Sequence, residues 1–108
     1  MQSHWRARIA EACSEAEVMH VVRDYLDAWH PVERARLPAQ CDPPRMFDAQ
    51  DLNSYLVDLM RFDPASRPAC ADALRDLIAF FSGASQRLAV LMAVGGEFPA
   101  RPRYFAER

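Results

Sequence analysis

Eight prolines divide this chain into helical segments, and their positions limit its fold more than any other feature of the sequence. Proline lacks the backbone N–H that the interior of an α-helix needs, so each proline tends to start or end a helix. Between the prolines, apolar residues recur every three or four positions, which is the period of an amphipathic helix. No stretch shows the strict alternation of a half-buried strand. The sequence therefore predicts an all-α fold, a small helical bundle of about four helices with a short extra turn in the central crossover and no sheet.

The N-terminal part of the chain carries two apolar stripes. On one continuous helix their centres would lie more than about 100° apart, so the chain is expected to turn between them. Ser14 and Glu17 form a capping-box pattern, which is typical of a helix start. We therefore expect a short first helix near 3–12 and a second helix near 15–29.

The middle of the chain is the least regular part of the sequence. Pro31 suits the first position of a helix and predicts one or two helical turns after it. Further prolines then exclude a long helix, so residues 39–46 are expected to form an extended crossover on the surface. Asp48 is a good N-cap for the next helix, which is expected to end at Asp63–Pro64.

The last helix is predicted to be the longest. Ser66 is expected to cap it, and Pro68 is tolerated in its first turn. Apolar residues spaced by four and three positions form a heptad seam from Cys70 to Leu91. The small residues around Gly83 leave two alternatives open, a close helix crossing or a break into two helices. Residues 1–96 are thus one predicted domain, and residues 97–108 are a C-terminal tail that is expected to fold back on the bundle.

Charge and composition narrow the classes of partner. The net charge is only −2, and all thirteen basic residues are arginines, which favours a GC-rich bacterial genome as the source. Only the tail is locally basic, so the sequence disfavours nucleic acid and an anionic membrane surface as partners. No apolar run has the length of a membrane span, and no N-terminal signal pattern is present. We therefore expect a cytoplasmic protein.

The sequence shows no complete catalytic or metal-binding pattern. The three cysteines, Cys13, Cys41 and Cys70, are widely spaced and form no CxxC pair, so they are interpreted as reduced thiols. Glu17 and His20 match the Glu-x-x-His spacing of di-iron bundles, but such a site needs a second motif and two further carboxylates. They are weak metal candidates, and a solvated acidic helix face explains them better. The sequence predicts no catalytic residue, no metal and no cofactor.

The last helix is apolar on nearly every side, which indicates one of two arrangements. Either it lies at the centre of the bundle, or a second subunit covers its excess apolar face. We favour a homodimer. The expected partner-binding residues are Phe80, Arg87, Leu91 and Val94 on the helix and Arg101, Arg103, Tyr104 and Phe105 in the tail.

These observations favour a protein–protein interaction or regulatory module without catalytic activity. The first alternative is a nucleic-acid-associated regulator that uses the basic and aromatic tail, since arginine and aromatic side chains can stack on single strands. The second is a ligand-binding or metal-binding helical bundle enzyme. The largest losses of stability are expected from removing the side chains of Trp29 and Phe81.

Overall fold

The computed structural model describes residues 3–95 of the chain and the side chains of residues 4–93. Over residues 3–95 the chain forms helices and turns and no strand, which confirms the predicted all-α class. The elements are, in chain order, α1 (Ser3–Glu11), α2 (Glu15–Asp27), α3 (Pro31–Ala35), the 3-10 turn η1 (Ala39–Cys41), α4 (Ala49–Leu59), the 3-10 turns η2 (Pro64–Ser66) and η3 (Pro68–Cys70), and α5 (Ala71–Gly95).

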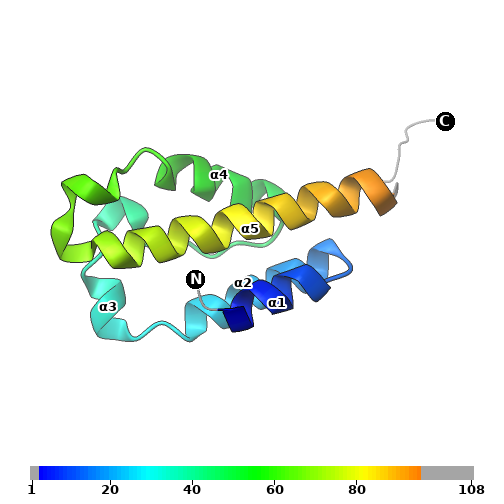
Figure 1. Cartoon of the computed structure of the whole chain (residues 1–108), viewed down its shortest axis with the longest axis horizontal. Helices are drawn as coiled ribbons and strands as arrows, with labels where there is room; N and C mark the ends of the chain where they lie inside the picture. Colours follow the sequence, from blue (N-terminus) through cyan, green and yellow to red (C-terminus); the bar gives the residue numbers. More distant parts are fainter. Residues whose placement is uncertain (1–2, 96–108) are drawn as a thin grey trace.

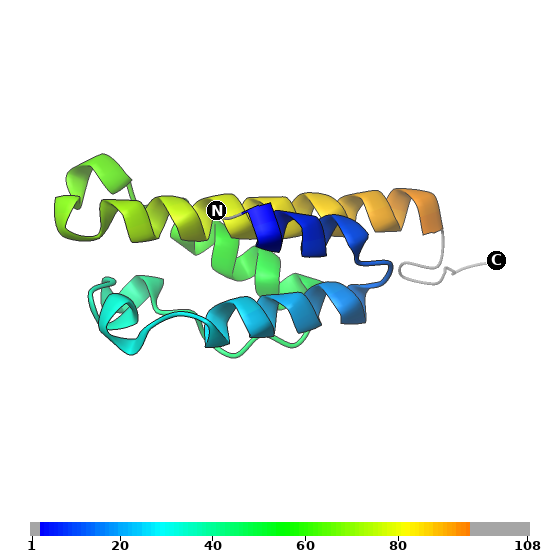
Figure 2. The ribbon, with the colours of Figure 1, turned by 60° about the horizontal axis from the view of Figure 1, so that its bottom comes forward.

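Helix α5 is the axis around which the other helices pack. It contacts α1, α2 and α4. Figure 1 shows α4 along one side of α5 and the α1–α2 pair along the other, and Figure 2 shows the same arrangement after a turn of the molecule. The short helix α3 lies at the end of the bundle where α5 begins (Figure 1). Helix α5 thus has neighbours on several sides, while Val90 and Met92 on it stay 47% and 46% exposed, and the homodimer stays a prediction.

Local capping explains where α2 and α4 begin. The hydroxyl of Ser14 accepts a hydrogen bond from the N–H of Glu17, and the carboxylate of Glu17 accepts one from the N–H of Cys13 at 2.7 Å. The carboxylate of Asp48 likewise accepts the N–H of Asp51 at 2.9 Å. These bonds satisfy donors that the first turn of a helix leaves free. Both predicted N-caps are therefore confirmed.

The start of α5 differs from the prediction. Ser66 does not cap it, because its hydroxyl donates to the carbonyl of Asp63 at 2.7 Å. Two 3-10 turns that begin at Pro64 and Pro68 come first, and α5 starts at Ala71. The prediction was wrong here because each proline starts a short turn of its own.

The crossover between α3 and α4 is less exposed than the sequence suggested. Cys41 and Met46 belong to the core, with exposed fractions of 0% and 3%. The hydroxyl of Tyr55 donates to the carbonyl of Cys41 at 2.6 Å, which satisfies a buried backbone acceptor. The prediction of a crossover on the surface was therefore wrong for Cys41 and Met46, because this segment covers the core beside α4.

The heptad seam of α5 forms the middle of the core. Its fully buried members are Leu74, Leu77, Phe81, Ala84 and Leu88, and the helix continues through Gly83 without a break. Ser82 and Gly83 line a hollow between α1 and α5, so of the two alternatives for these small residues the break is excluded. None of the helices within residues 3–95 is long and apolar enough to cross a membrane.

Candidate functional site

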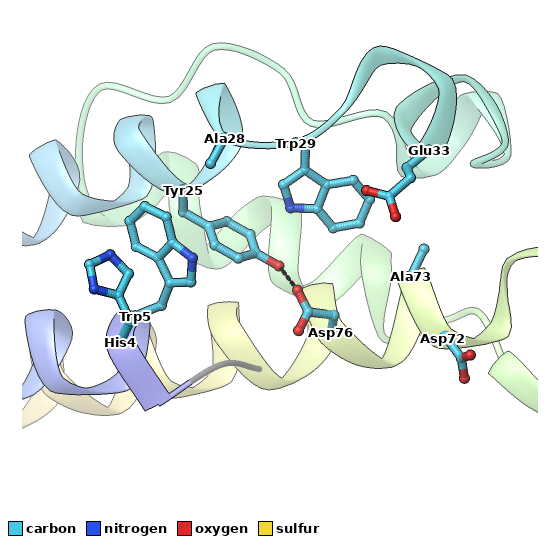
Figure 3. A pocket seen from close by; sticks show the side chains of 9 residues that line it. All are labelled: His4, Trp5, Tyr25, Ala28, Trp29, Glu33, Asp72, Ala73 and Asp76. Atoms are coloured by element: carbon cyan, nitrogen blue, oxygen red, sulfur yellow. Dashed lines mark hydrogen bonds between the residues drawn. The ribbon is translucent and has the colours of Figure 1, made fainter.

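A pocket of about 450 Å³ opens where α1 starts, α2 ends and α5 starts, next to α3 (Figure 3). Three aromatic and three acidic residues characterise it, and we call it the aromatic–acidic pocket. Its lining consists of Trp5, Tyr25, Trp29, Glu33, Asp72 and Asp76, together with His4, Ala28 and Ala73.

Helical spacing places the main lining residues on the same faces of their helices. Tyr25 and Trp29 are four residues apart along α2 and the turn that follows it, and Asp72 and Asp76 are four apart on α5. Residues at this spacing are neighbours on one helix face. Packing of α2 against α5 then brings the aromatic pair and the acidic pair together.

Tyr25 forms the floor of the pocket and the two tryptophans form its walls. The Tyr25 ring stacks on Phe80 with centroids 3.7 Å apart, and only 2% of Tyr25 is exposed. Trp5 and Trp29 meet its ring edge-on at 5.5 and 6.1 Å and are only partly buried. Edge-on and offset contacts are the favourable geometries for aromatic rings. The two indoles therefore offer accessible aromatic surface on a rigid base.

A hydrogen bond holds one of the carboxylates against this floor. The hydroxyl of Tyr25 donates to Oδ2 of Asp76 (Figure 3). Burial raises the pKa of Tyr25 well above its usual value of 10.0, and the neighbouring Asp76 carboxylate raises it further. Tyr25 therefore stays protonated at neutral pH and acts as a hydrogen-bond donor, so it is not a candidate for a general base.

The pocket carries an excess of negative charge. Its lining includes three carboxylates and no arginine, whereas each of three other hollows on the described surface includes at least one arginine. Asp72 has Arg75 as a neighbour at 3.4 Å on the same helix. Glu33, by contrast, forms no side-chain hydrogen bond or ion pair with the residues that the structure describes. Because opposite charges attract most strongly where solvent access is reduced, the pocket favours a cationic group.

The nine lining residues suit binding better than covalent chemistry. The potentially reactive groups among them are the His4 imidazole, the Tyr25 hydroxyl and three carboxylates, and serine, threonine and cysteine do not occur in this lining. The cysteines of the described chain lie elsewhere, with Cys13 exposed and Cys41 and Cys70 buried. Burial raises the pKa of the Cys41 thiol, which disfavours the nucleophilic thiolate.

The weak metal candidates have other roles in the structure. Glu17 is the capping carboxylate of α2, and His20 is a mostly exposed side chain whose Nε2 lies 3.6 Å from Asp24. Over the described range of the chain, His, Cys, Asp and Glu side chains do not gather in groups of three or more that could hold a metal ion.

Of the partner-binding residues predicted from the sequence, Phe80, Arg87 and Leu91 do not line this pocket. The prediction that Phe80 contacts a partner was wrong, because its side chain is 0% exposed and stacks on Tyr25 inside the core. Arg87 donates from Nε to the carbonyl of Ala12 at 2.9 Å, and Leu91 packs partly buried against the core. The Val94 side chain and residues Arg101, Arg103, Tyr104 and Phe105 lie outside the part that the structure describes.

The sequence contained a weak signal for the pocket. From the sequence, Trp29 was predicted only as a side chain whose removal should cost stability. Glu33 follows Trp29 by four residues, but no motif marks the pair as a site. The other two carboxylates, Asp72 and Asp76, come from α5, and nothing in the local sequence links them to Trp29.

Comparison of the chain with models of known protein families, with curated proteins and with solved structures finds no match.

Proposed function

We propose that this protein is a non-catalytic protein-binding module of the bacterial cytoplasm, and that the aromatic–acidic pocket is its binding site. The observation that carries the proposal is the pair of partly exposed tryptophans, Trp5 on α1 and Trp29 in the turn after α2, which line one pocket. Tryptophan is enriched among the residues that contribute most to protein–protein binding. Two such residues on a rigid base form a preorganised anchor site, which lowers the entropic cost of binding.

The chemistry of the pocket supports a binding role. Its tyrosine hydroxyl is held by Asp76 and stays protonated. Its carboxylates disfavour phosphate groups, so the pocket is a poor site for the backbone of a nucleic acid.

Selection of peptides from a random displayed library on the immobilised full chain tests this proposal. We expect selected peptides to lose about fivefold or more in affinity for Trp29→Ala, since truncation of such an anchor costs more than about 1 kcal/mol. Met60→Ala is the matched control, because Met60 is a large exposed side chain, 59% exposed, on α4. Affinities are measured by isothermal titration calorimetry.

A second variant changes the pocket with little risk to the fold. Glu33 lies exposed on α3, so Glu33→Arg changes the charge of the pocket without removing core contacts. Circular dichroism checks that each variant keeps its helicity. Selected peptides that bind both pocket variants as tightly as the wild type would show that the binding site lies elsewhere.

A further inference from the structure

We propose that the aromatic–acidic pocket binds an arginine side chain of the partner protein, with the guanidinium lying over Trp29 and paired with Glu33. This inference rests on the proposed function and names the chemical group that the pocket recognises.

The molecule already contains one complete arrangement of this kind. The guanidinium carbon of Arg8 lies 5.4 Å from the centre of the Trp5 ring, and its Nη2 atom lies 2.8 Å from Oδ2 of Asp24. The aromatic face attracts the cation, and the carboxylate accepts its hydrogen bond. The Arg8 bond also holds the pKa of Asp24 below its ordinary value.

Trp29 and Glu33 repeat two parts of this arrangement. Figure 3 shows the carboxylate of Glu33 beside the indole of Trp29, and both belong to the lining of the pocket. Within residues 4–93, arginines lie over the rings of Trp5, Phe47 and Phe62, but none lies over Trp29. The chain thus supplies an aromatic face and a carboxylate at this position, and a partner would supply the arginine.

The geometry favours arginine over a quaternary ammonium group. Recognition of a quaternary ammonium uses a cage of several open aromatic faces. Here Arg8 already covers a face of Trp5, and Tyr25 is 2% exposed with Phe80 stacked on it. The partly exposed indole of Trp29 is the aromatic surface that remains, and a planar guanidinium can stack on it while donating to a carboxylate.

Nuclear magnetic resonance on the full-length protein tests the inference. The probes are three short capped peptides, alike except for a central arginine, lysine or citrulline, together with tetramethylammonium. Citrulline has nearly the shape of arginine but no charge. We expect the arginine peptide to shift the indole N–H signal of Trp29 at millimolar concentration. The lysine peptide should bind several-fold more weakly, and the citrulline peptide should cause no saturable shift.

Variants connect the signal to the proposed contact. Glu33→Gln should weaken the arginine peptide about threefold to tenfold, whereas Glu11→Gln, which changes an exposed glutamate at the end of α1, should leave its affinity unchanged. The inference is wrong if citrulline binds as well as arginine, if tetramethylammonium binds more tightly, or if the shifts centre on another surface. Pocket-dependent peptides that lack a basic anchor would also overturn it, while leaving the proposed protein-binding function in place.

Discussion

The two sides of α5 each bury a tyrosine, and they give its hydroxyl different partners. On the α4 side, Tyr55 donates to the backbone carbonyl of Cys41, and the crossover covers the pair. On the α2 side, Tyr25 donates to the carboxylate of Asp76 at the wall of an open pocket. Both hydroxyls are satisfied, but only the second bond uses a charged acceptor that belongs to the lining of a pocket.

The type of hydrogen-bond acceptor distinguishes a tyrosine that only stabilises the core from one that forms part of a pocket. A neutral carbonyl acceptor closes the core and leaves no charge to be solvated. A carboxylate acceptor must stay near solvent, since full burial of a charge is costly. The α2 side therefore keeps an opening that the α4 side does not need.

The largest expected effect comes from the residue that touches both sides. Phe81 is 0% exposed and meets the rings of Tyr25 and Tyr55 edge-on at 6.3 and 5.0 Å. We expect Phe81→Ala to lower the free energy of unfolding by about 3–5 kcal/mol. Trp29→Ala should cost about half as much, because Trp29 is only partly buried at the pocket. Urea unfolding of both variants measures the difference, and equal losses would place Trp29 in the core rather than at a binding site.

A smaller loss of stability is expected when either tyrosine hydroxyl is removed. Tyr55→Phe leaves the buried carbonyl of Cys41 without this donor, and we expect a loss of about 1–3 kcal/mol. Tyr25→Phe should cost less than about 1 kcal/mol, because water in the pocket can solvate the partly buried carboxylate of Asp76. Chemical denaturation of the two variants measures both values. The reverse order would mean that the pocket excludes water and that its floor is part of the closed core.

The smallest effect appears only at alkaline pH. The pKa values of Tyr25 and Tyr55 are both raised above their ordinary value of 10.0, mainly by burial. The unfolded chain releases these protons near pH 10 while the folded chain retains them. Their contribution to stability is therefore complete below pH 10 and is lost as the pH rises above it. At pH 10, where about half of each tyrosine is deprotonated in the unfolded chain, we expect a loss of about 0.4 kcal/mol per tyrosine.

Unfolding measured against pH, for the wild type and for each Tyr→Phe variant, checks this prediction. Each variant should show a flatter alkaline loss than the wild type. If Tyr25→Phe leaves the curve unchanged, the hydroxyl of Tyr25 titrates normally and is open to solvent, and the two tyrosines differ more than their burial implies.

The parts of the fold that were predicted from sequence depend on neighbours along the chain. Ser14 and Asp48 cap α2 and α4 through bonds to residues three positions away, so their roles follow from local sequence. The heptad seam of α5 was also predicted, because its spacing is a property of one helix. The start of α5 was missed because two prolines compete to start a turn, and sequence alone does not rank them.

The pocket was not predicted, because most of its members come from distant parts of the chain. Glu33 is only four residues from Trp29, but Trp5 and Asp76 join them only when α1 and α5 pack beside α2. Phe80 lies off the seam of α5 and was expected on an outer face, yet its stack on Tyr25 buries it. Which face of a helix is covered depends on the helices that pack against it, and the spacing within one helix does not specify them.

The sequence by itself determined the all-α class, the approximate bounds of α1 and α2 and the caps of α2 and α4. Each of these depends on hydrogen bonds and apolar periods that span a few residues. Only the tertiary structure decided that α4 ends at Leu59, that α5 packs against three other helices, and that two tryptophans share a pocket with three carboxylates. The physical reason is that helix packing and site chemistry depend on contacts between side chains far apart in the sequence, which local patterns constrain only weakly.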